Sequence, residues 1–530
     1  MCESGVAMDG LMPRSTGMCE SGVAMDGLMP RQKRKSGFGQ RRQRWPEGLR
    51  AVGPNHPQGC ARAALTRELF MQAPFDIAAD LDTPVSAYLK LKAMRPRFLL
   101  ESVEGGERLA RYSFLGFGDA VEVRMDRSVL RINGEVHPRP QDQHEYLDSL
   151  RRVLAFAPRP KPDDDLPFAG GLVGVSGYDV VRLFERLPQD TEPQTSVPDA
   201  AFVAPSSLLV FDHLTRRVAL LHDGPESDRQ RLRAEVIRQL RGPIPATERD
   251  VSIAPAEASL TEQEYSDRVD ACKEYIAAGD IYQIVLSILF RGKTNVPPFE
   301  VYRALRLLNP SPYMFYFDFD DLQVVGSSPE ALVKLNHNRA SLRPIAGTLP
   351  RGATREEDRA NEEALLADPK EAAEHVMLVD LARNDLGRVA RAGSVRVDPY
   401  RAIERYSHVM HIVSGVQGEL ADEFDQFDLF AASFPAGTLV GAPKVRAMEI
   451  IEEMEQVGRG LYAGTAGYFG LGGDMDQAIT IRTLVFSGDE YSFQAGAGIV
   501  ADSVPAREYQ EVLAKSAILR RALEIAGEGL

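Results

Sequence analysis

The stretch "SLTEQEYSDRVDACKEYIAAGDIYQIVLSILF", residues 259–290, decides the fold, because it opens the longer half of the globular chain with a well-marked helix. Thr261 and, three residues later, Glu264 have the pattern of a capping box, which begins a helix. Gly279 ends this helix, since glycine adopts the left-handed conformation at little cost. The rest of this half mixes helices with strands that are joined by tight glycine-rich turns. This alternation predicts an α+β protein with mainly antiparallel sheet.

The first half of the globular chain has the same character. In "TPVSAYLKLKAM", residues 83–94, Thr83 is expected to cap a helix that starts at Pro84. Short β-type runs follow between residues 97 and 133, separated by Gly, Asp and Asn turns, and further strand-like runs occur at residues 170–181 and 206–224. The polar stretch "GPIPATERDVSIAPAEAS", residues 242–259, resembles a linker. We therefore expect an N-terminal region at 71–250 and a second region at 251–530.

Composition excludes several classes of protein. The chain has 530 residues, of which 44% are hydrophobic and 26% are charged, as in a globular protein with a large core. No apolar run reaches the length of about 18 residues that a membrane-spanning helix needs. Residues 1–70 contain 11 Lys and Arg against 6 Asp and Glu, whereas the remainder contains 51 against 70. So acidic a body argues against nucleic acid as the main partner.

The N-terminus repeats itself. "MCESGVAMDGLMPR" occurs at Met1–Arg14 and again at Met18–Arg31, and a stretch rich in Lys and Arg follows. Few apolar residues recur there at the period of a helix or strand, so we expect residues 1–70 to be a disordered extension. The basic stretch is also compatible with a transit peptide or a nucleic-acid-binding arm. The simplest interpretation is an upstream extension, with the working chain starting near Met71.

Cysteine usage points to a reducing compartment. Cys2, Cys19 and Cys60 lie in the extension, and only Cys272 lies in the body of the chain. A chain of this length with one body cysteine has no disulfide framework, which fits the cytoplasm. Cys272 falls inside the predicted helix, where a small buried hydrophobe is favoured over a nucleophile.

Two predicted helices each place carboxylates on one face. In "ADPKEAAEHVMLVDLARNDLG", Asp368 caps a helix that starts at Pro369, so that Glu371 and Glu374 share a face. Such pairs are ordinarily solvated faces. Two of them together can hold a hard divalent cation through oxygen, and Mg²⁺ is the natural candidate.

The second helix lies in "DSVPAREYQEVLAKSAILRRAL", near the C-terminus. Asp502 or Ser503 is expected to cap it. Glu508, Glu511 and Lys515 then follow on one face.

Other chemistry-bearing residues are less specific on their own. His408 and His411, three apart in a strand-like run, point to opposite faces and lack a third zinc ligand. Each is a substrate contact, a proton carrier or a core histidine. Arg482, expected in a strand among apolar neighbours, needs an anionic partner, which is either a substrate carboxylate or a structural ion pair. The residues Gly496–Gly498, expected after a strand, can present backbone N–H groups to an anion.

Many motifs in order along the chain resemble component I of anthranilate synthase, in the chorismate-utilising enzyme family. The resemblance runs from about Phe75 to the C-terminus. The stretches that carry it are "GDIYQIVLS" (279–287), "NPSPYMFYF" (309–317), "VVGSSPE" (324–330), "RPIAGT" (343–348), "EAAEHVMLVDLARNDLGRV" (371–389), "HVMHIVSGV" (408–416), "GAPKVRAMEII" (441–451), "GYFG" (467–470), "AITIRT" (478–483), "AGAGIVADS" (495–503) and "EYQEVLAKS" (508–516). The family fold implies large, mainly antiparallel sheets packed as a sandwich and surrounded by helices.

The resemblance assigns roles to these residues. It implies that Glu374 and Glu511 bind Mg²⁺, supported by Glu371 and Glu508, and that the metal grips a carboxylate of chorismate. Glu330 matches the general acid that protonates the departing C4 hydroxyl, a poor leaving group. His411 matches a substrate-facing catalytic position. The expected substrate contacts are Gly347, Thr348, Thr438, Tyr462, Arg482, Gly496, Ala497, Gly498 and Lys515.

Two positions narrow the reaction within the family. Relatives that add water at C2 carry a lysine where this chain has Gln283, because water needs a base and ammonia does not. Relatives that aminate C4 commonly carry a nucleophilic lysine in place of Ala346. Gln283 and Ala346 together therefore predict amination at C2 followed by loss of pyruvate, which yields anthranilate for tryptophan biosynthesis.

The resemblance also implies two partners. Ammonia comes from a glutamine amidotransferase subunit in this family, and we expect such a partner because Cys272 has no glutaminase-like surroundings. Leu100, Glu101 and Ser102 in "LLES", with Pro312, Tyr313 and Met314, resemble a feedback site for L-tryptophan. The alternative is that "LLES" is a structural strand.

The sequence alone leaves two alternative reactions open. The chain could aminate C4, as aminodeoxychorismate synthases do, or stop at 2-amino-2-deoxyisochorismate without releasing pyruvate. A non-catalytic protein on the same fold is disfavoured, because Glu330, Glu374 and Glu511 are all present.

Overall fold

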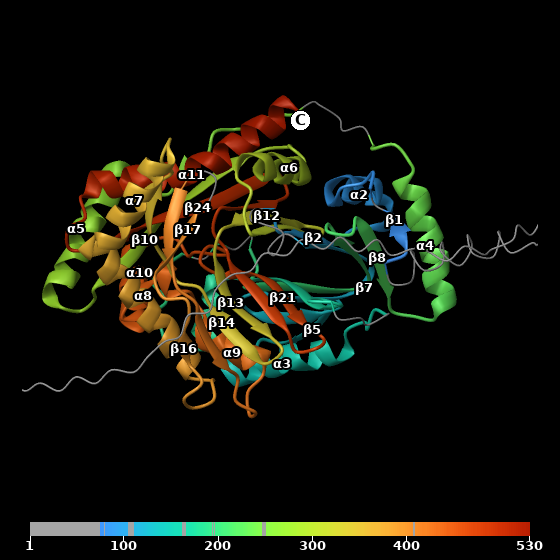
Figure 1. Cartoon of the computed structure of the whole chain (residues 1–530), viewed down its shortest axis with the longest axis horizontal. Helices are drawn as coiled ribbons and strands as arrows, with labels where there is room; N and C mark the ends of the chain where they lie inside the picture. The colour runs from blue at the N-terminus through green and yellow to red at the C-terminus, as the bar shows by residue number, and fades with distance from the viewer. Residues whose placement is uncertain are drawn as a thin grey trace, which may run out of the picture. The chain divides into compact units, whose positions relative to one another are not determined.

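Long antiparallel strands dominate the chain (Figure 1). The computed structural model describes residues 75–78, 80–103, 111–161, 166–192, 194, 197–245, 251–405 and 409–530. All of these residues fall in one unit, Ala63–Leu530. The predicted disordered extension, residues 1–70, lies outside the described residues, and so does His408.

The elements from the first region are β1 (Ile77–Ala78), α2 (Pro84–Lys90), η1 (Lys92–Met94), β2 (Phe98–Glu101), β3 (Tyr112–Met125), β4 (Val129–Ile132), β5 (Glu135–Pro138), α3 (Gln143–Phe156), β6 (Gly171–Ser176), η2 (Tyr178–Leu183), β7 (Ala200–Asp212), β8 (Arg217–His222) and α4 (Glu226–Leu240). The elements up to the middle of the second region are β9 (Glu257–Ala258), α5 (Glu262–Ala278), β10 (Gln283–Lys293), α6 (Pro298–Leu308), β11 (Tyr313–Asp318), β12 (Leu322–Ser328), β13 (Ala331–Asn336), β14 (Arg339–Leu342), β15 (Ile345–Pro350), α7 (Arg355–Ala367) and α8 (Pro369–Gly387). The remaining elements are β16 (Arg396–Val397), β17 (Ala402–Arg405), β18 (Val409–Val413), β19 (Val416–Glu419), α9 (Gln426–Ser433), η3 (Gly437–Leu439), β20 (Gly441–Ala442), α10 (Lys444–Met454), β21 (Thr465–Gly470), β22 (Met475–Ile479), β23 (Thr483–Ser487), β24 (Glu490–Ile499) and α11 (Pro505–Glu528).

One hydrogen-bonded network joins 21 of these strands. It divides at β7, which pairs with both β3 and β6. The first branch continues from β3 through β2, β11, β12, β23 and β24 to β10. The second branch continues from β6 through β21, β22, β13, β14 and β19 to β16. Each of these pairings is antiparallel, as predicted.

Apolar side chains from both branches meet in a shared core. Phe98 and Phe315 from the first branch belong to the same buried cluster as Val173 and Ala466 from the second. A second and larger cluster includes side chains from α5, α10 and α11. The branches therefore pack face to face with helices against them, and the predicted α+β sandwich is confirmed.

Local signals set most of the predicted helix starts. Thr261 accepts the Glu264 N–H at 3.3 Å while the Glu264 carboxylate accepts the Thr261 N–H at 2.8 Å, and Gly279 ends α5 at φ +86°. Asp368 caps α8 as expected. The expected side-chain cap of α11 is wrong: its N-cap is Val504, and the Ser503 hydroxyl accepts the Val500 N–H at 3.0 Å instead.

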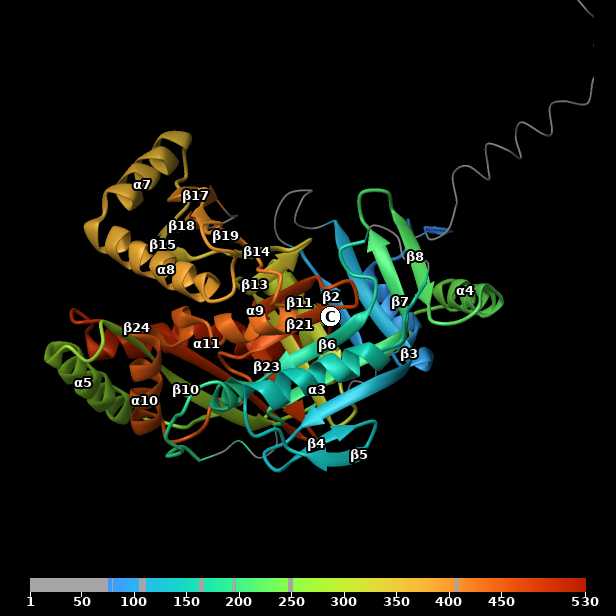
Figure 2. The ribbon, with the colours of Figure 1, turned by 90° about the horizontal axis from the view of Figure 1, so that it is seen from below.

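A separate three-stranded sheet lies outside the large network. It has the order β15–β18–β17 and packs against α7 and α8, which are grouped with it in Figure 2. Leu365, Met410 and Ile412 form its own small buried cluster. This unit is called the α7–α8 module below, and it carries several of the predicted site residues.

The two predicted regions share the sandwich. β2 pairs with β11 and β6 pairs with β21, so strands from both sides of residue 250 lie next to each other. The division into regions 71–250 and 251–530 stays a prediction. No helix among the described residues is long and apolar enough to cross a membrane.

Candidate active site

Glu330 lies where the chain passes from the first branch to the second, between β12 and β13. The Thr438 hydroxyl donates to its carboxylate at 3.1 Å. Burial raises the pKa of Glu330 to about 7, although the Thr438 hydrogen bond and the charges of Arg482 and Lys515 act to lower it. A carboxyl group with this pKa is able to give up a proton near neutral pH, as a general acid must.

His411 and Thr348 face each other across the small sheet of the α7–α8 module. They are register partners on β18 and β15, and the Thr348 hydroxyl lies 3.0 Å from His411 Nδ1. The Gly347 carbonyl lies 3.1 Å from the same nitrogen. The pKa of His411 is lowered, mainly by burial, and Arg482 contributes in the same direction. The neutral imidazole is therefore favoured at neutral pH.

Gly347 occupies a bulge between Ala346 and Thr348, at φ +67°. A side chain there would be strained, and its Cβ would come within 3.0 Å of the Glu371 carboxylate. Ala346 beside it is 7% exposed and lies opposite Ile412, so its methyl group packs into the module.

Arg482 does not lie within a strand, so the expected strand placement is wrong. It occupies the connection between β22 and β23, at φ +49°. Its charge acts on both Glu330 and His411. The cation therefore lies close enough to act on the charge of the general-acid candidate and of a side chain in the α7–α8 module.

The stretch Gly496–Gly498 also differs from expectation, because it lies inside β24 and not after a strand. Gly496 faces Ser287 and Gly498 faces Val285 on β10. The Ser287 N–H donates to Glu455, and the Val285 N–H donates to Val440. Both facing pairs are thus the non-hydrogen-bonded kind, so the N–H groups of the two glycines point away from β10. This geometry leaves two amides directed away from the ladder with β10.

Three more predicted residues surround these glycines. The Gln283 side chain lies close to Gly498, where an added Cβ would meet its amide nitrogen at 2.9 Å. The Tyr462 hydroxyl lies close to Gly496, where an added Cβ would meet it at 2.7 Å. Lys515 donates to the Gly496 carbonyl at 3.0 Å and pairs with Glu511 at 2.7 Å.

The predicted metal carboxylates form two pairs, on α8 and α11. Burial and the neighbouring Glu374 raise the pKa of Glu371. Burial raises the pKa of Glu508 too, with a further rise from Glu511, while Lys370 at the start of α8 lowers it. The two helix starts are therefore near each other, but within the described part of the chain no three acidic, His or Cys side chains form a metal-binding group. The oxygen donors match Mg²⁺ in kind.

All six predicted tryptophan-site residues line one cavity of about 460 Å³. Leu100, Glu101 and Ser102 lie at the end of β2, and Pro312, Tyr313 and Met314 lie at the start of the neighbouring strand β11. The Glu101 carboxylate is already paired with Arg306 Nε at 3.0 Å and accepts the Tyr302 hydroxyl. These contacts hold the Glu101 side chain against α6.

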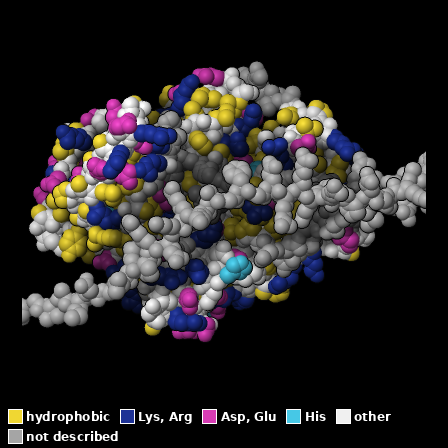
Figure 3. All heavy atoms as spheres, in the orientation of Figure 1, with side chains coloured by type: hydrophobic (Ala, Val, Ile, Leu, Met, Phe, Trp, Pro, Cys, Tyr) yellow, Lys and Arg dark blue, Asp and Glu magenta, His cyan; other side chains and the backbone are white. Residues whose placement is uncertain are grey.

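Two further expectations concern the body cysteine and the charge of the surface. Cys272 lies fully buried in α5, and burial raises the pKa of its thiol to about 12. It is therefore a small buried hydrophobe, as favoured from the sequence. On the face seen in Figure 3, basic and acidic side chains are interspersed.

Sequence reasoning missed a buried ion pair behind the site. Arg459 and Glu455 bond to each other and to the backbone of β10. The sequence signal for this pair was a Glu and an Arg four residues apart, just before Tyr462. It was weak, because this spacing is common on solvated helix faces.

Comparison with known proteins identifies the family of the chain. The profile of the chorismate binding enzyme family matches residues 95–521. Hence the chain belongs to the chorismate-binding enzymes, in the branch of anthranilate synthase component 1. It is 45% identical over 470 residues to that protein of Aquifex aeolicus, covering 86% of this chain and 94% of the relative. It is 47% identical over 460 residues to that of Thermus thermophilus, covering 85% and 97%.

A solved structure supports the same placement. The chain is similar to the crystal structure of anthranilate synthase component I from Streptococcus pneumoniae, with a TM-score of 0.71 and 36% identity. The match covers 84% of this chain and 99% of that one.

Proposed function

We propose that the chain is the chorismate-converting component of an anthranilate synthase, a lyase at the first committed step of tryptophan biosynthesis. Ammonia adds at C2 of chorismate, the C4 hydroxyl leaves as water, and pyruvate is then eliminated to give anthranilate. The observation that carries the proposal is the buried Glu330 carboxyl, whose pKa of about 7 suits a general acid.

The substrate carboxylates need cations and N–H donors. Arg482 and Lys515 supply positive charge close to Glu330. The outward N–H groups of Gly496 and Gly498 add donors beside the Tyr462 hydroxyl. An anion held by these groups would lie within reach of the acid that protonates its leaving group. His411, which is neutral and held by Gly347 and Thr348, adds a further hydrogen-bonding group to the site.

Two residues favour amination at C2 over the related reactions. Gln283 starts β10 beside Gly498, where a neutral amide is able to position ammonia without acting as a base. Ala346 is buried and offers no nucleophile to C4. Product identification separates this reaction from its rivals, because anthranilate is fluorescent and 2-amino-2-deoxyisochorismate is not aromatic.

We propose Mg²⁺ as the cofactor, held by Glu374 and Glu511 with Glu371 and Glu508 in support. Burial raises the pKa values of Glu371 and Glu508, and the like charge of the second glutamate in each pair raises them further, so a bound cation would offset part of both effects. When bound, the ion neutralises a substrate carboxylate.

Two partners and a location complete the proposal. A glutamine amidotransferase subunit supplies ammonia, since the buried, protonated Cys272 is unsuited to glutamine hydrolysis. L-Tryptophan inhibits by occupying the cavity at Leu100, Ser102 and Met314. We place the chain in the cytoplasm because its body carries a single cysteine.

The test is incubation of the purified chain with chorismate, ammonium and Mg²⁺. Fluorescent anthranilate is expected, and EDTA is expected to abolish it. Glutamine should replace ammonium only after the amidotransferase is added. Consumption of chorismate without fluorescence would point to one of the rival products, and glutamine-driven turnover by the pure chain would exclude the separate partner.

A further inference from the structure

A buried ion pair between Glu455 and Arg459 lies behind the candidate active site. Glu455 directly follows α10, and Arg459 lies in the connection to β21. Their side chains are only 5% and 1% exposed. Arg459 donates to both carboxylate oxygens, from Nε at 2.9 Å and from Nη2 at 2.7 Å. A guanidinium so deeply buried needs acceptors for its remaining N–H groups, so its other contacts show what it holds.

Arg459 joins two elements that carry predicted site residues. Its Nη1 donates to the Leu439 carbonyl at 2.8 Å, and its Nη2 donates to the Val285 carbonyl at 2.7 Å. Leu439 follows Thr438, which bonds Glu330, and Val285 lies on β10 two residues after Gln283. One rigid planar group thus fixes the Thr438 turn relative to the Gln283 strand.

Glu455 extends the same contact along β10. Its carboxylate accepts the Ser287 N–H at 2.9 Å and the Ser287 hydroxyl at 2.7 Å. Val285 and Ser287 are the residues that face Gly498 and Gly496. The ion pair therefore bonds the edge of β10 that faces away from β24, and so keeps the two glycine amides directed away from β10.

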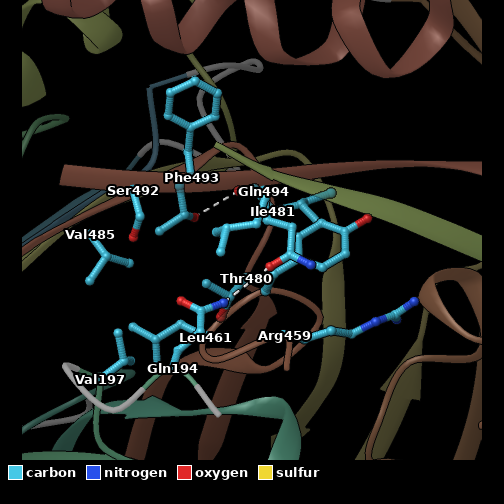
Figure 4. A pocket seen from close by; sticks show the side chains of 13 residues that line it. Gln194, Val197, Arg459, Leu461, Thr480, Ile481, Val485, Ser492, Phe493 and Gln494 are labelled. Carbon is cyan, nitrogen blue, oxygen red and sulfur yellow. Dashed lines mark hydrogen bonds between the residues drawn. The ribbon is translucent and has the colours of Figure 1, made fainter. Parts of the chain in front are cut away.

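Tyr462 depends on the same pair. The Arg459 guanidinium carbon lies 5.6 Å from the centroid of the Tyr462 ring, and the Arg459 carbonyl accepts the Tyr462 N–H at 2.9 Å. Figure 4 shows Arg459 with Gln194 and Gln494 around a small cavity of about 20 Å³, which Tyr462 also lines. Gln494 donates to the Ser287 hydroxyl at 2.8 Å, which links this cavity to the Glu455 contact.

Stability alone is a weak reason for such a pair, because well-packed apolar side chains of similar volume often stabilise a protein core equally well or better. What the pair adds is a fixed spacing between three parts of the chain: the Thr438 turn, β10 and the segment that carries Tyr462. We propose that Glu455 and Arg459 are positioning residues for the amination reaction: they hold Thr438, Tyr462 and the amides of Gly496 and Gly498 in place around Glu330. This inference rests on the proposed function.

The experiment compares Arg459→Lys with the wild type, using chorismate, ammonium and Mg²⁺. Lysine keeps the charge, but one ammonium group cannot bond Leu439, Val285 and both Glu455 oxygens together. We expect kcat per folded molecule to fall by about 10- to 100-fold. The alkaline limb of the kcat–pH profile should also move to higher pH, because a displaced Thr438 hydroxyl no longer lowers the pKa of Glu330.

Glu452→Gln is the matched control. Glu452 lies on α10, is 3% exposed and pairs with Arg182, so the variant also breaks a buried ion pair one turn away. It should lose thermal stability but keep the wild-type kcat per folded molecule and the wild-type pH limb. Glu455→Gln, a neutral isostere, replaces Arg459→Lys in the comparison if the latter does not fold.

The outcomes separate the two proposals. A folded Arg459→Lys or Glu455→Gln enzyme with wild-type kcat and an unmoved alkaline limb overturns the positioning role. An equal shift of the limb in Glu452→Gln overturns it too, because a general loss of stability would then explain the change. Absence of anthranilate with the wild-type chain overturns the proposed function instead.

Discussion

At the scale of single residues, Glu330 combines burial with a position between two strands of different branches. Its pKa of about 7 means that the folded protein retains a proton which the unfolded chain releases near pH 4.5. Below that pH both states are protonated, so the group has no effect on stability. As pH rises towards 7 the unfolded state ionises first, and stability falls by about 3 kcal/mol in total.

Glu330→Gln tests this prediction, because glutamine keeps the shape of the side chain and cannot ionise. We expect its free energy of unfolding, relative to the wild type, to rise by about 3 kcal/mol between pH 4 and pH 8. Turnover should fall by about 10²- to 10⁴-fold, since the general acid is lost. Denaturant unfolding at a series of pH values measures the first effect. A difference that does not vary with pH would contradict the raised pKa.

At the scale of elements, the β15 bulge depends on Gly347. We expect Gly347→Ala to lower the free energy of unfolding by about 1 kcal/mol, because alanine is strained at this left-handed φ. Turnover should fall at least about 10-fold, because the new Cβ displaces Glu371 or shifts Thr348 away from His411. Gly393→Ala is the control: its φ is +78°, and nothing lies within 4 Å of an added Cβ. It should lose similar stability in thermal unfolding and keep full activity. Equal activity in both variants would remove Gly347 from the site.

Two glutamates of α11 allow another matched comparison. Glu511 and Glu524 both lie on α11, and each forms an exposed ion pair, with Lys515 at 2.7 Å and with Arg521 at 2.9 Å. Exposed pairs contribute at most about 1 kcal/mol, so Glu511→Gln and Glu524→Gln should differ little in stability. Activity in a Mg²⁺ titration should fall at least about 100-fold for Glu511→Gln alone. Similar titration curves for both variants would exclude Glu511 as a ligand.

Elements that local signals define were predictable from the sequence. The capping box of Thr261 and Glu264 and the cap at Asp368 need only neighbouring residues, and both are found. Arg482 was misplaced because its left-handed backbone is imposed by the turn between β22 and β23. Gly496 was placed after its strand because glycine is a weak strand former, whereas pairing with Ser287 on β10 keeps it in the ladder. The contacts of Arg459 were beyond prediction, since its partners at Val285 and Leu439 are distant in sequence.

At the scale of the whole unit, the predicted tryptophan cavity lies between the two branches of the sandwich. Leu100 and Met314 belong to β2 and β11 of the first branch, whereas Lys334 and Tyr468 belong to β13 and β21 of the second. The chain crosses from one branch to the other at Glu330, between β12 and β13. A ligand that changes the spacing of the branches therefore acts on the strands that hold Glu330.

Ser102→Phe tests this coupling, because the new ring would fill part of the cavity that Ser102 lines. We expect L-tryptophan to inhibit the wild type in the ammonium assay, and the variant to need at least about 10-fold more tryptophan for the same inhibition, since a filled cavity loses most of its apolar contacts with the ligand. Ser227→Phe, on the exposed face of α4, should be inhibited like the wild type. Tryptophan that binds to the wild type without changing its turnover would show that the cavity and Glu330 are not coupled. Equal inhibition of all three proteins would place the regulatory site elsewhere.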